Sequence, residues 1–334
     1  MHLLSFKLCI FRNLVKKRYY WNTCKPPWNI IFFGSDNFSV YSLKALCEEY
    51  KSTELLSNIE VVTTIKGKPN PVQQFATEQC LPLHNWPVNI PKNQYHIGLV
   101  VSFGHLIPEQ VINKFKYGIL NVHASLLPRW RGAAPIIYAI ANDDKETGIS
   151  IMRIKPKHFD VGDIVLQSSV KITEDMKMPE LHEKLAKLGA GKLVETLHNL
   201  PDNLSNAKPQ SNENVTFAPK VKQEFAQIQW TKTAREIYNL ERSLVGFLTP
   251  YTYWKELPVK LFDIKECEFK FSDETIQPGF VVFDKSYKNI KVFCGNRTWI
   301  SVEKLGVLGK KIMSGVDFNN GYLKKEKSEN RYFK

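Results

Sequence analysis

The sequence predicts an α/β fold, in which a mostly parallel, Rossmann-like sheet precedes a small OB-like β-barrel. From Asn29 onward, short apolar runs alternate with helical patterns, which is typical of a parallel sheet covered on both faces. A polar stretch at residues 202–214 ends this alternation, and short strand-like runs separated by polar turns follow it. The chain has 334 residues, of which 43% are hydrophobic, and this suffices for two domains with separate cores.

The first predicted domain, residues 29–200, begins with a strand at residues 30–33. Gly34 permits a tight turn after it, and Ser35 or Asp36 can cap the helix that follows. A long helix is predicted over residues 179–200, because leucines recur there at near-helical spacing. The further predicted strands are residues 59–65, 97–102, 119–123, 149–154 and 164–170.

Residues 201–216 are predicted as a linker and residues 217–330 as a C-terminal barrel domain. A helix is predicted over residues 231–244. The predicted barrel strands are residues 259–264, 280–283, 290–294 and 298–302.

The chain is strongly basic, with a formal charge of +13 from 46 Lys and Arg against 33 Asp and Glu. Such an excess attracts phosphate-bearing partners, such as a nucleic acid or an anionic membrane. Residues 217–334 contribute roughly 21 basic against about 14 acidic residues, which suits a phosphate backbone. The alternative is that a leader segment and solvated lysines account for the excess.

The first 28 residues have the composition of a targeting segment. Six Lys and Arg residues are mixed with apolar residues before the first acidic residue, Asp36. This pattern is typical of a mitochondrial transit peptide. A secretory signal is the competing interpretation, but Lys7 and Arg12 interrupt the apolar stretch that it would need. We therefore expect residues 1–28 to be a transit peptide.

Several function classes are disfavoured by what the sequence lacks. The six cysteines are scattered, and no His and Cys cluster has metal-site spacing, so neither a disulfide scaffold nor a metal site is expected. No apolar run reaches the roughly 18–20 residues that span a bilayer, so no membrane association is expected. The turn at Gly34 lacks the second and third glycines of a dinucleotide fingerprint, which argues against nicotinamide chemistry.

Asn121 and His123 form the first candidate for chemistry. Side chains two apart in a strand share a face, so both would lie at the carboxyl edge of the sheet, where ligands of open α/β sheets bind. An amide donor beside an imidazole can stabilise an oxyanion and move a proton, as acyl transfer requires. An isolated Asn-x-His pair more often has the structural role of a hydrogen-bonded strand end. The neighbouring residues must therefore decide between a structural and a catalytic role.

Asp160 is the second candidate, in the segment between two predicted strands. A carboxylate on such a loop can orient an imidazole and accept a proton. The alternative is an aspartate in an ordinary turn, which the neighbouring Gly162 favours, and the residues alone leave this open. Asp163 is expected to be a cap or turn residue.

The segment from Asn121 to Pro135 reads Asn-Val-His-Ala-Ser-Leu-Leu-Pro-Arg-Trp-Arg-Gly-Ala-Ala-Pro. This run resembles the signature of the folate-dependent formyltransferases. Its residues are most similar to those of the family members that act on methionyl-tRNA. Residues 33–35 with Phe38, and residues 102–108, 217–220 and 228–230, extend the resemblance. It therefore covers the chain from about Asn29 to about Leu244, whereas the terminal barrel resembles the family only in general pattern.

The resemblance implies the formyltransferase fold and transfer of a formyl group from 10-formyltetrahydrofolate to methionine on initiator methionyl-tRNA. It implies that Asn121 and His123 hold the tetrahedral oxyanion without a metal. The family's aspartate precedes an x-Gly pair, which implies that Asp160 removes the amine proton. The resemblance implies a pteridine cradle made of two segments, Ser102, Phe103, Gly104, His105 and Leu106, and Ser125, Leu126, Leu127 and Pro128.

Four lysines are candidates for contacts with tRNA. Lys66 and Lys68 lie in a short loop where bacterial members of the family usually carry a longer basic one, so they are either a reduced version of it or solvated turn residues. Lys220 and Lys222 are chosen from clustering alone, and a solvated face explains them equally well.

Alternative functions remain open at this point. Related enzymes use the same three residues on small-molecule amines or to hydrolyse the formyl-folate, so either activity is an alternative. A catalytically idle RNA-binding protein is another, although intact Asn121, His123 and Asp160 argue against it. The expectation is a monomeric enzyme that supports translation initiation in the mitochondrial matrix.

Overall fold

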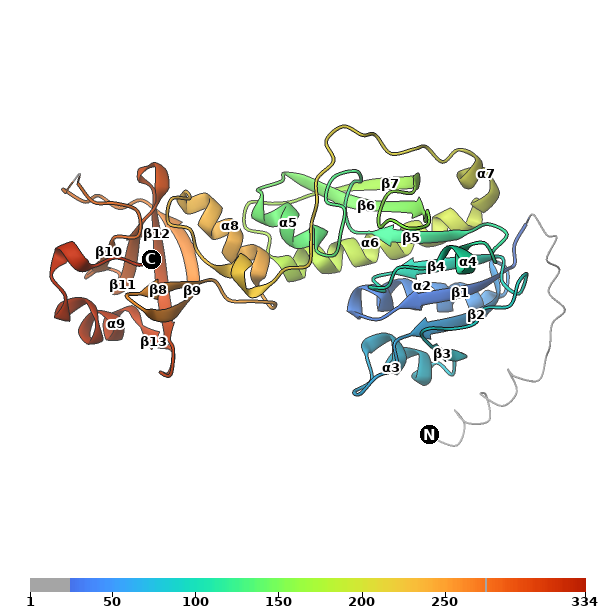
Figure 1. Ribbon diagram of the computed structural model, residues 1–334, viewed down its shortest axis with the longest axis horizontal. Coiled ribbons are helices and arrows are strands. Elements are labelled where there is room, and N and C mark those ends of the chain that lie inside the picture. Colours follow the sequence, from blue (N-terminus) through green and yellow to red (C-terminus); the bar gives the residue numbers. More distant parts are fainter. Residues whose placement is uncertain (1–24, 274) are drawn as a thin grey trace. The chain divides into compact units, whose positions relative to one another are not determined.

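The computed structural model describes residues 25–273 and 275–334, and Figure 1 shows their helices and strands. Most of the predicted transit peptide therefore lies outside the described residues. The chain divides into two compact units. Unit 1 extends to Pro135 and also includes Thr147–Val170 and His182–Pro219, whereas unit 2 consists of Ile136–Glu146, Lys171–Leu181 and Lys220–Lys334.

Unit 1 is built on a sheet that has, within the described residues, seven strands in the order β3-β2-β1-β4-β5-β6-β7. The pairs from β3 to β5 are parallel, and β6 runs antiparallel to β5. The predicted mostly parallel sheet is therefore confirmed. In chain order, the elements of this part of the chain are β1 (Trp28–Gly34), α2 (Asn37–Ser52), β2 (Leu56–Thr63), α3 (Pro71–Glu78), β3 (Leu83–Asn85), β4 (Ile97–Val101), α4 (Glu109–Ile112), β5 (Ile119–His123), α5 (Pro135–Ala141), β6 (Glu146–Arg153), β7 (Asp163–Lys171), α6 (Met178–His198) and α7 (Leu200–Ser205). Most of α5 and the beginning of α6 belong to unit 2.

Burial explains why these segments form the centre of unit 1. All seven residues of β1 are buried, as expected for a strand covered on both faces. Helix α2 begins at a capping box, in which the Asp36 carboxylate accepts from the Ser39 amide and the Ser39 hydroxyl accepts from the Asp36 amide. Helix α6 packs closely on β5, because a Cβ built on Gly189 would lie 2.9 Å from the Val122 side chain. Strand β5 is thereby fixed where the candidate residues leave the sheet.

The segment predicted as a linker contains regular structure. Helix α7 occupies its beginning, and Lys208 then forms a two-way backbone pairing with Ile164 of β7. Residues up to Pro219 belong to unit 1. The predicted domain limits, 29–200 and 217–330, stay a prediction.

Unit 2 contains an antiparallel, half-barrel-like sheet, which is what the sequence predicted for the C-terminal part. Within the described residues its strand order is β10-β11-β12-β9-β8, and β13 pairs with β12. The elements of this part are η1 (Gln223–Ala226), α8 (Ala234–Leu244), β8 (Tyr251–Trp254), β9 (Leu257–Cys267), β10 (Val281–Asp284), β11 (Asn289–Phe293), η2 (Gly295–Arg297), β12 (Trp299–Val307), β13 (Met313–Ser314), α9 (Gly315–Gly321), η3 (Leu323–Lys325) and η4 (Ser328–Asn330).

Four aromatic side chains pack against one another within the largely aliphatic core of unit 2. Trp230 stacks on Phe333 with ring centroids 5.7 Å apart, and Trp254 meets the edges of Phe318 and Phe333. Helix α8 begins at a capping box formed by Thr233 and Glu236. This unit therefore has a core independent of the sheet of unit 1.

Residues 25–273 and 275–334 contain neither a candidate membrane-spanning helix nor a candidate metal site. No helix in these ranges combines the length and the apolar character that a membrane crossing requires. No group of three or more His, Cys, Asp or Glu side chains there could hold a metal ion.

Candidate active site

Asn121 and His123 project from the carboxyl half of β5. This strand lies between β4 and β6, with Asn121 opposite Met152 and His123 opposite Ser150. His123 is buried, and Asn121 is partly buried. The period of two along a strand places both side chains on one face, as predicted.

Both ring nitrogens of His123 face oxygen atoms. Nε2 lies 2.9 Å from the backbone oxygen of Trp130, and Nδ1 lies 3.5 Å from Oδ1 of Asp160. Because a carbonyl oxygen can only accept, Nε2 carries the hydrogen in that contact. Nδ1 of His123 is therefore the nitrogen that faces the Asp160 carboxylate.

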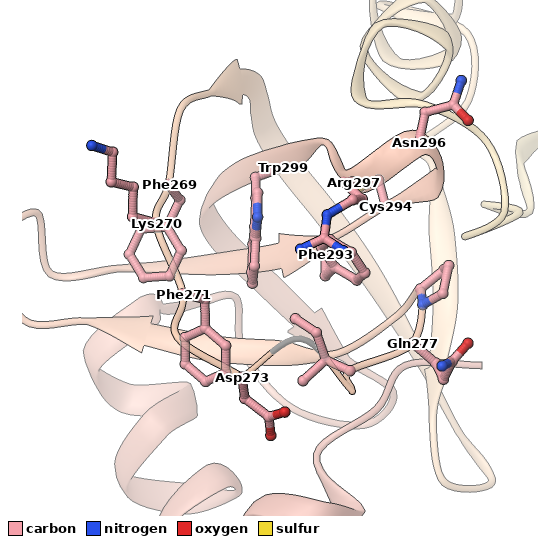
Figure 2. Close-up of a pocket in the computed structure, with 12 residues that line it drawn as sticks. Phe269, Lys270, Phe271, Asp273, Gln277, Phe293, Cys294, Asn296, Arg297 and Trp299 are labelled. Carbon is pink, nitrogen blue, oxygen red and sulfur yellow. The ribbon is translucent and has the colours of Figure 1, made fainter.

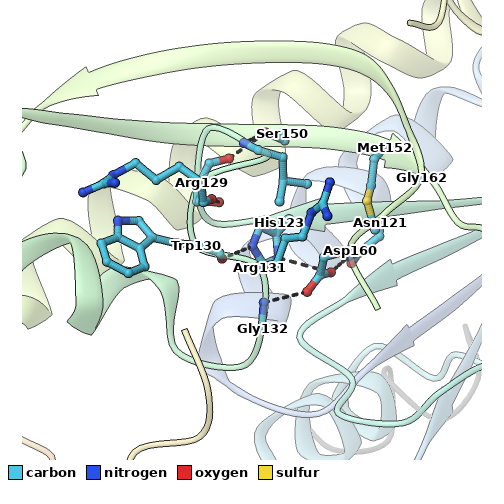
Figure 3. Close-up of polar contacts among 12 residues, drawn as sticks. Asn121, His123, Arg129, Trp130, Arg131, Gly132, Ser150, Met152, Asp160 and Gly162 are labelled. Atoms are coloured by element: carbon cyan, nitrogen blue, oxygen red, sulfur yellow. Dashed lines mark hydrogen bonds and ion pairs between the residues drawn. The ribbon is translucent and has the colours of Figure 1, made fainter. Parts of the chain in front are cut away.

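Asp160 joins Asn121 and His123 in one cluster, drawn in Figure 3. Its Oδ1 lies 3.4 Å from Asn121 Nδ2, and its Oδ2 accepts a hydrogen bond from the Gly132 amide at 2.9 Å. The residue is 7% exposed and has φ of +56°. For a non-glycine residue that conformation costs roughly 1–2 kcal/mol, so the surrounding structure must hold it. The structure thus brings the three predicted catalytic residues together.

The predicted folate loop at residues 125–128 is held by the protein's own hydrogen bonds. The Ser150 hydroxyl donates to the Ser125 carbonyl and accepts from the Leu127 amide, and Gln167 Nε2 donates to the Leu127 carbonyl. Ser125 and Leu127 are buried, whereas Leu126 and Pro128 are partly exposed. Surface for a ligand is therefore offered by Leu126 and Pro128, while Ser125 and Leu127 shape the loop.

The other predicted folate segment, residues 102–106, leaves the end of β4. Phe103 is buried, while Ser102, Gly104, His105 and Leu106 are exposed. Ser102 is fixed by two contacts, since its hydroxyl donates to the Asp36 carboxylate and its carbonyl accepts from the Ser35 hydroxyl. Gly104 has φ of +76° and open space where a side chain would be, so its backbone is accessible.

Aromatic rings surround this segment. Phe103 contacts the rings of Phe33, Trp86 and His105 at centroid distances of 5.5, 5.3 and 5.0 Å. His105 Nε2 lies 3.0 Å from the Thr64 hydroxyl, which ties the segment to the end of β2. Flat apolar walls beside exposed backbone groups are what a bicyclic heterocycle requires.

Gln210 and Thr216 border the cluster, although neither was predicted as a site residue. The Thr216 hydroxyl accepts from the Trp130 amide at 2.9 Å, and Oε1 of Gln210 accepts from Nε and Nη2 of Arg131 at 3.1 and 2.7 Å. Both lie in the polar stretch that was predicted as a linker. In the sequence, only the resemblance of residues 217–220 to the family indicated that this region packs against the rest of the domain.

The four predicted tRNA-contacting lysines are exposed, but they lie in different units. Lys66 and Lys68 flank Gly67, which has φ of +67°, in the loop between β2 and α3. Lys220 and Lys222 belong to unit 2. The two pairs are therefore described separately.

Unit 2 also has an aromatic-lined hollow of about 590 Å³, shown in Figure 2. The Trp299 ring lies between Phe269 and Phe293, with centroids 5.0 and 5.1 Å away. Trp299 and Phe293 are only 6% and 9% exposed, so neighbouring rings cover the faces that a stacked nucleobase would need. We assign this cluster to packing.

Comparison with known proteins gives matches along most of the chain. The model of the formyl transferase family matches residues 88–197, and that of the formyl transferase C-terminal domain matches residues 220–323. The human protein named mitochondrial methionyl-tRNA formyltransferase is 40% identical over 310 residues, which are 90% of this chain and 79% of the human one. The methionyl-tRNA formyltransferase of Fusobacterium nucleatum is 32% identical over 303 residues, which are 87% and 96% of the two chains.

Solved structures share the fold at lower identity. WlaRD, a sugar 3N-formyl transferase crystallised with dTDP and 5-N-formyl-THF, has a TM-score of 0.61 and 20% identity, covering 85% of this chain and 98% of its own. HypX from Aquifex aeolicus in complex with tetrahydrofolic acid has a TM-score of 0.55 and 16% identity, covering 89% and 48%. At these identities the likeness concerns the fold.

Proposed function

Because the chain belongs to the formyl transferase family, we propose that it transfers the formyl group of 10-formyltetrahydrofolate to the amino group of methionine on initiator methionyl-tRNA. The relatives at 40% identity are mitochondrial enzymes by name, and we assign this activity to translation initiation in the mitochondrial matrix. The observation that carries the chemistry is the cluster of Asn121, His123 and Asp160 at the end of β5.

The reaction can be written with these residues in distinct roles. The methionine nitrogen attacks the formyl carbon, and the resulting oxyanion is stabilised by hydrogen bonds from Asn121 and His123. Asp160 accepts the amine proton, while Nδ1 of His123 donates a proton to the departing folate nitrogen and Nε2 keeps its hydrogen on the Trp130 carbonyl. The 3.5 Å contact between His123 and Asp160 then lets that proton pass back to the imidazole, so the site is reset. No covalent enzyme intermediate is needed.

The donor would lie against the segment at the end of β4. The exposed backbone at Ser102 and Gly104 offers polar groups to the pteridine, while the rings of Trp86 and His105, packed on the buried Phe103, form flat walls beside it. Leu126 and Pro128 would close the other side. The fit supports a formyl-folate donor, the class of donor that this family uses.

The acceptor tRNA would be attracted by the basic surface. Lys66 and Lys68 of unit 1, and Lys220 and Lys222 of unit 2, are exposed and available for phosphate contacts. Neutralising several phosphates makes binding fall steeply as salt rises. We propose a monomeric enzyme that acts on this one macromolecular acceptor.

The test is transfer of labelled formyl from 10-formyltetrahydrofolate to methionyl initiator tRNA by the full chain, with uncharged tRNA and other aminoacyl-tRNAs as controls. Selective formyl-methionyl product is expected. Turnover of the folate without labelled tRNA would instead indicate a small-molecule transferase or a formyl-folate hydrolase, and tRNA binding without turnover would indicate a binding protein.

A further inference from the structure

Gln210 lies in an extended segment of unit 1 that is anchored on both sides. Before it, Lys208 exchanges two backbone hydrogen bonds with Ile164 at 2.7 and 2.9 Å. After it, the backbone of residues 216–218 pairs with the loop that follows β5, through Arg131 N to Thr216 O and Ala218 N to Arg131 O at 2.9 and 2.7 Å. Gln210 is therefore held beside the candidate active site although it is far from it in sequence.

The side-chain amide of Gln210 connects two parts of that site. Its Nε2 donates to the backbone carbonyls of Asp160 and Gly162 at 2.9 and 2.8 Å. Its Oε1 accepts the two hydrogen bonds from the guanidinium of Arg131. Both hydrogens of the amide nitrogen and both lone pairs of the oxygen are thus used.

The chemistry of these partners fixes the orientation of the amide. A guanidinium can only donate and the two carbonyls can only accept, so exchanging O and N would break every one of these contacts. Glutamine fits this position, whereas a carboxylate would serve Arg131 but would have no hydrogen for the carbonyls.

The Asp160 loop needs such support. Asp160 has φ of +56°, a conformation that non-glycine residues seldom adopt. On its other side the loop packs against β6, where a Cβ built on Gly162 would lie 1.8 Å from the Arg153 carbonyl oxygen. The loop that carries the carboxylate is thus held between β6 and the Gln210 amide.

From this geometry we infer that Gln210 is a positioning residue for formyl transfer: it holds the Asp160 peptide so that the carboxylate stays directed at His123 and Asn121. The inference rests on the proposed function, because it assigns Asp160 a role in removing the amine proton. Gln210 itself touches Asp160 only through the backbone, so it acts through the position of the carboxylate.

Two substitutions distinguish the contacts of Gln210 with Arg131 from its contacts with the Asp160 loop. Gln210→Glu keeps the acceptor for Arg131 and removes both donors to the loop, whereas Gln210→Met removes all four contacts at similar length. A misplaced reacting group costs on the order of 10- to 100-fold in rate, and we expect that loss in kcat for both variants, with KM for folate and tRNA within about twofold of wild type. Near-wild-type kcat for Gln210→Glu would show that only the Arg131 contact matters and would overturn the inference.

A matched control is Gln74→Met. The Gln74 amide also donates to a backbone carbonyl of unit 1, that of Pro69, but it is exposed on α3. This variant should keep wild-type kcat and KM. Melting temperatures of all variants would show whether each one is folded, and a loss of kcat that merely follows a loss of folded protein would count against a positioning role.

A double-mutant cycle with Asp160→Asn distinguishes failure of the inference from failure of the proposed chemistry. If Gln210 acts through Asp160, Gln210→Met should have little further effect on the residual kcat of Asp160→Asn. Gln210→Met could instead lower kcat by the same factor in wild type and in Asp160→Asn. Alternatively, Gln210→Met could keep wild-type kcat while Asp160→Asn is impaired. Either outcome would overturn the role of Gln210 but not that of Asp160. Full turnover by Asp160→Asn would overturn the proposed role of Asp160, and the inference with it.

Discussion

The carboxylate of Asp160 accepts a hydrogen bond from the backbone amide of Gly132, with 2.9 Å between Oδ2 and N. Gly132 has φ of +127°, where a side chain is strongly disfavoured. A Cβ built on it would also lie 2.5 Å from the Ala218 carbonyl oxygen. The contact that orients the carboxylate therefore requires glycine at this position.

Gly132→Ala should reduce formyl transfer by about 100-fold, because the loop must shift to relieve the clash and the amide then no longer meets Asp160. Steady-state kinetics with both substrates would measure this. The control is Gly191→Ala in α6, where no atom lies within 4 Å of the added carbon. That variant should keep full activity, and equal activity of the two variants would contradict the role of Gly132.

His123→Asn should lower kcat by roughly 10²- to 10⁴-fold, because it removes the group that moves protons in the proposed reaction. Binding of the folate should persist, since the predicted cradle lies on other segments, and equilibrium titration with the folate would measure this. His198→Asn serves as the control, because His198 is exposed at the end of α6. Unchanged turnover by His123→Asn would exclude it from the chemistry.

Elements whose residues follow a local periodic pattern could be predicted from the sequence alone. The buried strands 30–33, 97–102 and 119–123 correspond to β1, β4 and β5, and the leucine spacing at 179–200 corresponds to α6. The pairing of Asn121 and His123 followed from strand periodicity. The placement of Asp160 beside them needed the family resemblance, and the comparisons confirm that family membership.

Features that depend on distant partners could not be predicted. Gln210 sits in a polar stretch without periodicity, and its importance becomes visible only when Arg131 and Asp160, some fifty or more positions away in sequence, surround it. Strand β3 has only three residues and exists because β2 supplies a parallel partner. Long-range hydrogen bonds of this kind leave no local pattern in one sequence.

Arg242 should be a main stabilising residue of unit 2. It is 1% exposed, and its guanidinium contacts the Asn239 side chain at 2.8 Å, the Met176 carbonyl at 2.9 Å and the Asp143 carboxylate at 3.3 Å. Arg242→Met leaves these acceptors without their donor, and we expect a loss of about 2–4 kcal/mol in the free energy of unfolding.

Urea denaturation followed by tryptophan fluorescence would measure this loss. Arg235→Met is the matched control, because Arg235 forms a 2.6 Å ion pair with Glu266 at the surface. Such pairs contribute about 0–1 kcal/mol. Similar midpoints for the two variants would show that the buried contacts of Arg242 add little to stability.

His182 should make the stability of the protein sensitive to acid. It meets the edge of the buried Phe38 ring with centroids 5.3 Å apart, and burial lowers its pKa, although the Asp36 and Glu183 carboxylates act in the opposite direction. In the unfolded chain a histidine titrates near pH 6.5. Between that pH and the lower pKa of the folded state, the unfolded chain binds more protons, so stability falls as the pH decreases.

His182→Gln removes this titration while keeping a side chain of similar size. Wild type should therefore lose more stability than the variant when the pH is lowered from about 7.5 to about 5, whereas the difference between them should be constant above the unfolded-state pKa near 6.5. Melting temperatures across this range would measure both curves. Parallel stability curves for wild type and variant would mean that His182 is protonated equally in the folded and unfolded states. A steeper loss of stability for the variant would mean that Asp36 and Glu183 raise the pKa of His182 by more than burial lowers it.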